Sequence, residues 1–151
     1  MATNLQKFES LGGFSVGETV HVDELHNAKE FNSIEMKNSF YTDSKTTNYI
    51  LRGVNTATLQ LDDVGTSITI DNSTMNFITG HFIGVNPSGV VYSGKIESAV
   101  YCDGSGAVSE LSNMLTIIKH DVPVNESWNI SSFTATNRFS YSTVRTGTVQ
   151  T

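Results

Sequence analysis

The sequence predicts an all-β protein: an antiparallel β-sandwich or jelly-roll-like single domain with an extended N-terminal arm. Three observations support this fold class. Short runs of alternating apolar and polar residues recur along the 151-residue chain, and Gly, Asn and Asp separate these runs. Ser, Thr and Asn, at 18, 18 and 13 residues, make up about a third of the chain. Ser and Asn compete with helical hydrogen bonds and Thr is restricted at χ1, so this composition favours strands and turns.

The expected strands follow one another from residue 34 toward the end of the chain. Each holds apolar residues at alternate positions and is bounded by turn-forming residues. A period of two is typical of a strand with one buried face. About eight strands are expected, at residues 34–40, 47–51, 56–61, 66–70, 76–85, 90–101, 128–131 and 138–143.

The turn sequences between these strands predict two hairpins. Asp62-Asp63-Val64-Gly65 separates the runs at 56–61 and 66–70, and Gly65 is expected to take a positive φ. Asn86-Pro87-Ser88-Gly89 is a strong turn between two long strands. Asp103-Gly104-Ser105-Gly106 closes the second hairpin at its far side.

Two stretches interrupt the alternating pattern. Gly80 and Gly84 lie inside one expected strand, which predicts a bulge or bend there. Residues 110–120 fit two structures, because Leu111, Met114 and Ile118 have helical spacing whereas the β-branched residues nearby suit a strand. A short helix and a strand both stay open at this point.

One domain is the default for a chain of this length, which can bury a sizeable core. Residues 1–33 are the least regular part and are expected to form an N-terminal arm or edge segment. The β-rich body is expected to cover residues 34–151.

The charge pattern argues against several classes of partner. The formal net charge is −6, and the nine basic residues are scattered without a run. Nucleic-acid binding requires a clustered positive face, so we expect no direct nucleic-acid contact and no binding to an anionic membrane. The first residues lack the apolar core of a signal peptide, and no stretch has transmembrane length. The chain is expected to be made in a cytoplasm.

Motifs for catalysis or metal binding are weak. His21 and His26 are five residues apart and do not match the zincin spacing, so they suggest at most a weak surface metal site. Residues 13–17 spell Gly-x-Ser-x-Gly around Ser15, but the strand–helix context of a nucleophile elbow is missing. Cys102, the single cysteine, would need a base such as His81 or His120 beside it to act as a nucleophile. We therefore expect no enzyme activity, no cofactor and no metal.

Three aromatic residues in the last two expected strands are candidate contacts to another subunit or a glycan: Trp128, Phe139 and Tyr141. An exposed Trp can stack on a sugar, although a Trp in an alternating strand is more often in a core or an interface. Arg138 and Arg145 flank the last strand and suggest either salt links to a neighbouring chain or a solvated face.

Four segments are spread from the start of the chain to the last expected strand, at residues 1–16, 48–53, 95–104 and 138–143. Together they resemble small virion structural proteins of tailed phages, especially phages of marine cyanobacteria. The resemblance implies a structural protein of the phage particle and assigns no residue roles.

The sequence and the resemblance together predict a non-enzymatic virion component, assembled in the host cytoplasm. A multi-copy capsid decoration (cement) protein is the leading expectation, bound to capsid or tail proteins and to other copies of itself in a homo-oligomer such as a trimer. The final residues, 144–151, suit an edge strand that pairs with a neighbour. A tail-fibre or baseplate protein that contacts the host surface is the first alternative, and a small enzyme is the second.

Overall fold

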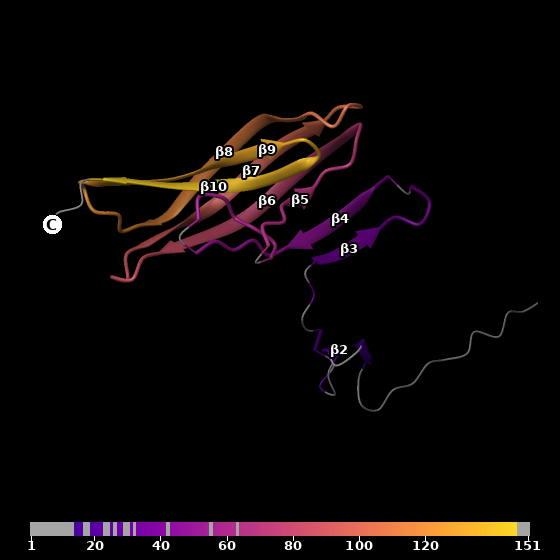
Figure 1. Ribbon diagram of the computed structural model, residues 1–151, viewed down its shortest axis with the longest axis horizontal. Helices are drawn as coiled ribbons and strands as arrows, with labels where there is room; N and C mark the ends of the chain where they lie inside the picture. Colours follow the sequence, from indigo (N-terminus) through magenta and orange to yellow (C-terminus); the bar gives the residue numbers. More distant parts are fainter. Residues whose placement is uncertain are drawn as a thin grey trace, which may run out of the picture. The chain divides into compact units, whose positions relative to one another are not determined.

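The structure is a computed structural model that describes residues 14–16, 19–22, 25, 27–28, 31, 33–41, 43–54, 56–62 and 64–147 (Figure 1). These residues contain ten β-strands and no helix, which confirms the all-β class. The strands are β1 (Phe14–Val16), β2 (Thr19–Val22), β3 (Ser33–Lys37), β4 (Lys45–Tyr49), β5 (Ile68–Thr69), β6 (Thr74–Val85), β7 (Val91–Cys102), β8 (Val108–His120), β9 (Glu126–Ala135) and β10 (Arg138–Gly147).

The chain divides into two compact units, residues 1–50 and residues 51–151. The first unit contains two antiparallel hairpins, β1–β2 and β3–β4. Asn38 begins the β3–β4 turn, where its Oδ1 accepts hydrogen bonds from the backbone N–H groups of Phe40 and Tyr41. The body expected from residue 34 therefore starts inside the first unit. The arm expected over residues 1–33 stays a prediction, because most of those residues lie outside the described part.

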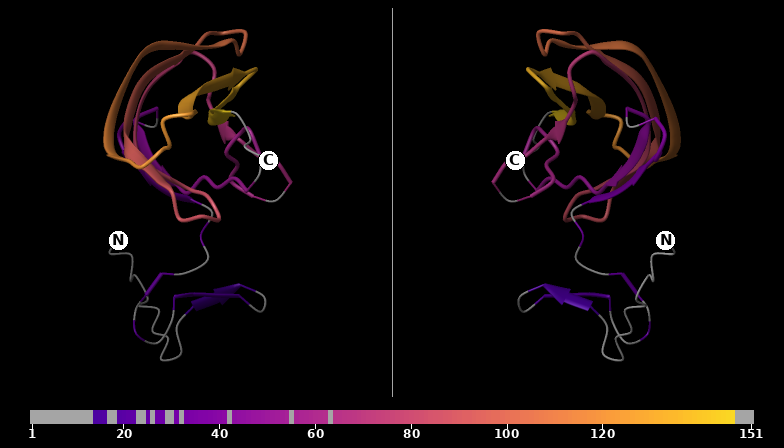
Figure 2. Two further views of the ribbon diagram at one scale, coloured as in Figure 1. Left: turned by 90° about the vertical axis from the view of Figure 1, so that its left-hand side faces the viewer. Right: turned by 90° about the vertical axis from the view of Figure 1, so that its right-hand side faces the viewer.

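The second unit is a β-sandwich of two three-stranded antiparallel sheets, ordered β6-β7-β8 and β5-β10-β9. Figure 2 shows the β6-β7-β8 sheet curving around β9 and β10. Along β7 every second side chain is buried, from Tyr92 to Cys102, because one face of this sheet packs on the other sheet. The buried core consists of Ile68, Ile70, Ile96, Val100, Cys102, Ile130, Phe139 and Tyr141.

Residues 110–120, which fitted a helix or a strand, are strand throughout. They belong to β8, whose backbone pairs with β7 over its whole length. Two irregularities in the register, at Ser93/Gly94 and Ala99/Val100, each add one residue to β8. These bulges explain why the apolar residues of β8 do not alternate strictly and mimic helical spacing.

The hairpin predicted over residues 56–70 is wrong, although its turn forms. The backbone N–H of Leu61 donates to the Thr66 carbonyl, and Gly65 has a φ of 95°. The two flanking runs do not pair with each other. Instead they lie one after the other along the same edge of β10, where Ile68 pairs with Phe139 and Thr58 bridges to Ser142. This arrangement places both runs against the core and satisfies the backbone groups along that edge.

The sequence predicted a bulge or bend at Gly80 and Gly84, and the bulge is wrong. The β6–β7 ladder runs without a register shift from Thr74 to Val85. Both glycines face inward, and a Cβ on Gly84 would lie 3.8 Å from the ring of Trp128. The absence of a side chain at Gly84 therefore makes room for an aromatic ring from the facing sheet.

Loops close one end of the sandwich through Asn137, which links three of them. Its side-chain Nδ2 donates to the Ile70 carbonyl at 2.9 Å and to Oδ1 of Asn72, and its backbone N–H donates to the Gly106 carbonyl. Asn137 adopts a φ of 55°, a left-handed conformation that Asn tolerates better than most residues. We call this region the closed end.

Candidate functional site

The opposite end of the sandwich contains a pocket of about 580 Å³, within the size range of small-molecule sites. Its walls come from the β6–β7 turn, the first half of β9, the second half of β10 and the loop over residues 53–59. We call this region the open end. Apolar side chains such as Phe82 and Ile130 line the pocket beside Trp128, Asn86 and Arg145.

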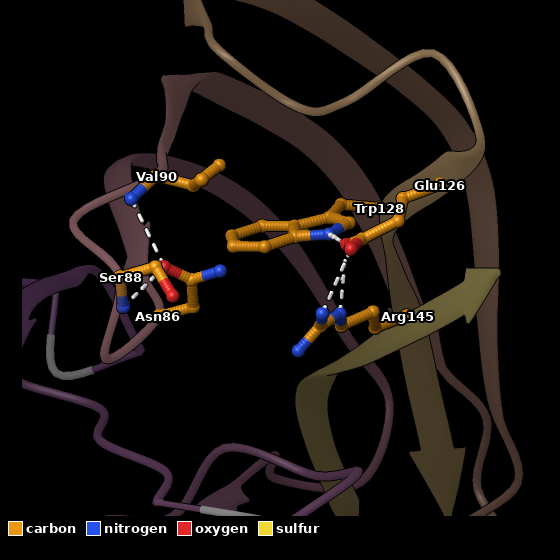
Figure 3. A network of polar contacts seen from close by, with 6 residues as sticks. All are labelled: Asn86, Ser88, Val90, Glu126, Trp128 and Arg145. Atoms are coloured by element: carbon orange, nitrogen blue, oxygen red, sulfur yellow. Dashed lines mark hydrogen bonds and ion pairs between the residues drawn. The ribbon is translucent and has the colours of Figure 1, made fainter. Parts of the chain in front are cut away.

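Trp128 is the central side chain of the pocket wall, and it is half-buried. Its Nε1 donates a hydrogen bond to Oε2 of Glu126 at 2.8 Å, so the indole N–H is used within the protein. The guanidinium carbon of Arg145 lies 5.6 Å from the centre of the ring, in a cation–π arrangement. Figure 3 shows the indole lying between the β6–β7 turn and the pair formed by Glu126 and Arg145.

Glu126 and Arg145 form a bidentate ion pair across β9 and β10. Nε of Arg145 donates to Oε2 at 2.8 Å, and Nη2 donates to Oε1 at 2.9 Å. The hydrogen bonds from Arg145 and then from Trp128 lower the pKa of the Glu126 carboxyl, and the same carboxylate raises the pKa of Arg145. The carboxylate therefore stays ionised and holds both the guanidinium and the indole in place.

The β6–β7 turn forms as the sequence predicted. Oδ1 of Asn86 accepts hydrogen bonds from the backbone N–H groups of Ser88 and Val90 (Figure 3). Gly89 has a φ of 81°, a conformation that glycine adopts without strain. The turn is thereby fixed by its own side chain and supplies one rim of the pocket.

This combination of groups suits a ligand with both apolar and polar faces. The Trp128 ring offers apolar surface, and Arg145 is exposed and uses only its Nε and one Nη in the ion pair. Aromatic rings beside a few polar groups are the usual composition of small-molecule pockets. The geometry therefore supports binding rather than indicating a particular reaction.

Two of the three candidate contact residues are buried, which corrects the prediction for them. Phe139 is 0% exposed and Tyr141 is 5% exposed, and their rings meet edge to face at 5.1 Å. The hydroxyl of Tyr141 lies 3.2 Å from Oγ of Ser98, and burial raises its pKa. A side chain in this position has no surface to offer a glycan or a second subunit. Trp128 alone lies at the surface of a pocket, and its contact role stays a prediction.

Cys102 lies in the core rather than in a reactive setting. Its side chain is fully buried, and burial raises the pKa of the thiol, with smaller contributions from Asp103 and Asp71. Its sulfur lies 3.7 Å from Nδ2 of Asn137. His120 instead packs edge to face on Tyr92, and His81 is exposed on the opposite face of its sheet. The structure brings neither histidine to the thiol, so Cys102 acts as a small buried residue of the core.

Several of the other motif residues lie partly or wholly outside the described part. His26 and the side chains of His21 and Ser15 are not described, so the weak metal site stays a prediction. The backbone of Ser15 lies within β1, paired with Val20, whereas a nucleophile elbow needs a strand–helix turn. Within the described residues, no group of three His, Cys, Asp or Glu side chains is placed to hold a metal ion. No helix in the same residues is long and apolar enough to cross a membrane.

Sequence reasoning missed the Glu126–Arg145 pair. Glu126 and Trp128 are two residues apart, so one strand face for both was predictable, but their partner depends on the register of β9 against β10. That register places Arg145 directly opposite Trp128. The sequence suggested a salt link to a neighbouring chain or a solvated face for Arg145, and the structure shows an ion pair within its own chain.

A second surface feature is the outer face of the β6-β7-β8 sheet, which consists of the residues of these three strands that point away from the core. Its β6 side chains include Met75, Phe77 and Ile83, which are 66%, 71% and 72% exposed. Val85, Tyr101 and Met114 extend this apolar surface and are also exposed. Most of these apolar residues lie in two groups, near the two ends of the face, and exposed apolar patches commonly mark an interaction site.

Comparisons with protein families, with curated protein sequences and with solved structures found no match.

Proposed function

We propose that this protein is a non-enzymatic structural component of a tailed-phage particle, present in many copies, most simply as a capsid decoration protein. The observation that carries this proposal is the outer face, where apolar residues of β6 lie exposed on a well-paired sheet. Such a surface gains free energy when another protein covers it, at roughly 25 cal/mol per Å² of apolar area. The segments that resemble virion proteins of tailed phages support the same proposal.

Mass spectrometry of purified particles tests this function directly. The phage that encodes the chain is grown, its particles are purified on a density gradient, and the peptides of this protein are quantified against those of the major capsid protein. We expect the protein in the particles at a copy number that scales with the capsid protein. Its absence from washed, infectious particles would contradict the proposal, and a few copies per particle would favour a tail position.

Paired variants connect the particle assay to the outer face. Phe77→Asp places a charge on the outer face, whereas Val64→Asp places one on an exposed turn at 84% exposure. Burial of an unpaired charge opposes association, so Phe77→Asp should reduce incorporation into particles and Val64→Asp should not. Equal incorporation of the two variants would contradict a role of the outer face in assembly.

The pocket at the open end supports a second candidate function, contact with the host surface from a tail fibre or baseplate. Half-buried Trp128 with Arg145 beside it resembles the aromatic and polar lining that sugar-binding pockets use. A glycan array with the wild-type protein tests this candidate. Trp128→Ala should abolish any signal, and Tyr101→Ala, which alters an aromatic residue away from the pocket, should preserve it. An array without signal would contradict this second candidate and leave the capsid decoration role as the remaining proposal.

A further inference from the structure

The outer face carries a self-complementary arrangement of side chains in rows across its three strands. The registers of β6 and β8 against β7 define these rows. Each row is set by one outward residue of β7 and its direct neighbours. In order along β7 the rows are Val85–Val91, Ile83–Ser93–Lys119, His81–Lys95–Thr116, Thr79–Glu97–Met114, Phe77–Ala99–Ser112 and Met75–Tyr101–Ser109.

Two opposite charges occupy the centre of this face. Lys95 and Glu97 are successive outward residues of β7, on either side of the buried Ile96. Within the described residues, neither takes part in an ion pair. The apolar residues of β6 lie toward the two ends of the face, beyond these charges. Any partner that covers the face must therefore supply a charge opposite each of them, since a buried unpaired charge opposes association.

We propose that the partner is a second copy of this chain, packed face to face about a two-fold axis. The axis lies between the two sheets and crosses β7 at right angles at the level of Ile96. It exchanges the rows on the two sides of Ile96. Lys95 then faces Glu97 of the second copy, and Glu97 faces its Lys95. This inference rests on the proposed function, because it names the partner of the assembly surface.

The same rotation also matches the apolar residues at both ends of the face. Phe77 falls opposite Ile83 of the second copy, and Met75 falls opposite its Val85. Val91 falls opposite Tyr101. Each of these pairs occurs twice in the dimer, once on either side of the axis, which is the pattern of an isologous interface.

A two-fold axis parallel to β7 would match neither the charges nor the apolar residues of the two faces. An axis parallel to β7 would keep each row in place, so Lys95 would face Lys95 and Glu97 would face Glu97. It would also lay the apolar residues of β6 on the outer residues of β8, most of which are polar: Ser109, Ser112, Thr116 and Lys119. Charge repulsion and poor apolar coverage both disfavour this arrangement.

Curvature limits the size of the contact. Figure 2 shows the β6-β7-β8 sheet bent around the core, so its outer face is convex. Two convex faces touch along a strip that contains Lys95, Glu97 and the neighbouring residues of β6. Small interfaces of this kind associate weakly, so we expect a dimer in the micromolar range that many copies on a particle would reinforce.

Charge reversal in the full-length protein tests the dimer. Lys95→Glu and Glu97→Lys each replace two attractive contacts per dimer with two repulsive ones. By sedimentation equilibrium we expect each single variant to raise the dimer dissociation constant by about tenfold or more. An equimolar mixture of the two variants should recover a dimer, because the two carboxylates of the first variant then face the two ammonium groups of the second. The double variant should also dimerise.

Matched controls show whether the loss of the dimer depends on this face. Arg138→Glu makes the same charge change on β10 in the other sheet, and it should leave the dissociation constant unchanged. Phe77→Ser removes apolar contact without a charge and should weaken the dimer as well. Circular dichroism confirms that each variant keeps its β-structure.

Three results would overturn the inference. They are a wild-type protein that stays monomeric at about 100 μM, well above a micromolar constant, a trimer in place of the dimer, and a dimer that the mixed variants fail to restore. The particle assay remains independent of all three. A protein found in particles but monomeric in solution would refute the dimer alone, and a dimer absent from particles would refute the virion role alone.

Discussion

The two ends of the sandwich hold their loops in place in different ways. At the closed end, Asn137 joins three loops by hydrogen bonds and Cys102 lies fully buried beneath them. At the open end, the β6–β7 turn is fixed by its own Asn86, and a pocket separates it from β9 and β10. One side chain thus joins several loops at the closed end, whereas the β6–β7 turn at the open end is held by its own side chain.

This difference shows where the molecule can tolerate change. A residue at the closed end serves several loops together, so its replacement disturbs all of them. A residue at the open end, such as Trp128, contacts a pocket that a ligand could enter without rearranging the core. We therefore expect substitutions at the closed end to lower stability and substitutions at the open end to affect ligand binding.

Phe139→Ala should have the largest effect on stability. Phe139 is 0% exposed near the start of β10, and its removal leaves a cavity between the sheets. Replacing a buried Phe by Ala typically costs about 3–5 kcal/mol. Urea unfolding followed by the fluorescence of Trp128, the single tryptophan, measures this loss. Phe40→Ala, at 88% exposure, is the control and should change stability little. A small loss of unfolding free energy in Phe139→Ala would contradict the position of Phe139 in the core.

A matched pair of glycines compares the two ends directly. Gly106 at the closed end and Gly89 at the open end both have positive φ, at 89° and 81°. A Cβ on Gly106 would collide with Oδ1 of Asn137, whereas a Cβ on Gly89 would meet nothing within 4 Å. Left-handed backbone alone costs a non-Gly residue about 1–2 kcal/mol. We expect Gly89→Ala to lose about that much, and Gly106→Ala to lose clearly more in the same urea assay. Equal losses would show that the closed end adapts to the added methyl group.

Cys102→Ala should produce a smaller loss that depends on pH. The variant leaves a small void beneath Asn137, which lowers stability at neutral pH. Burial raises the pKa of the thiol in the folded protein above its ordinary value of 9.0. The thiol therefore ionises first in the unfolded chain, and the wild type loses stability as pH rises through that value. The difference between the two proteins should narrow above pH 9 when urea unfolding is repeated at each pH. A difference that grows with pH would contradict a raised pKa.

The smallest effect is expected at the open end, for Glu126→Gln. The hydrogen bonds from Arg145 and Trp128 lower the pKa of Glu126 below its ordinary value of 4.5. Its contribution to stability is therefore present at neutral pH and is lost as pH falls through the lowered pKa. Trp128 fluorescence should change in the same acid range, since the indole N–H loses an ionised partner. The variant should lack this transition and unfold at nearly the same urea concentration as the wild type. Persistence of the transition in Glu126→Gln would assign it to another carboxyl.

The sequence predicted β6, β7 and the Asn86 turn between them because all three depend on neighbouring residues. Alternation along β7 and the turn chemistry of residues 86–89 are local signals. The errors came from long-range pairing. The runs on either side of Gly65 were predicted to pair with each other in a hairpin, but each pairs with β10 instead. The pocket was beyond sequence reasoning for the same reason, since Trp128 meets Arg145 through a register that no local pattern encodes.

The two runs that lie along β10 have a consequence for the order of folding. The hydroxyls of Thr58 and Ser142, 84 residues apart in the chain, come within 3.5 Å of each other. During synthesis on the ribosome, Ile68 and Ile70 cannot pack into the core until β10 has emerged, and β10 is the last strand of the sandwich. Contacts so distant in sequence slow folding, because the intervening chain must be ordered first. A nascent chain that stops before residue 138 therefore leaves Ile68 and Ile70 without Phe139 and Tyr141, their core partners from β10. The sandwich assembles only after β10 has been translated.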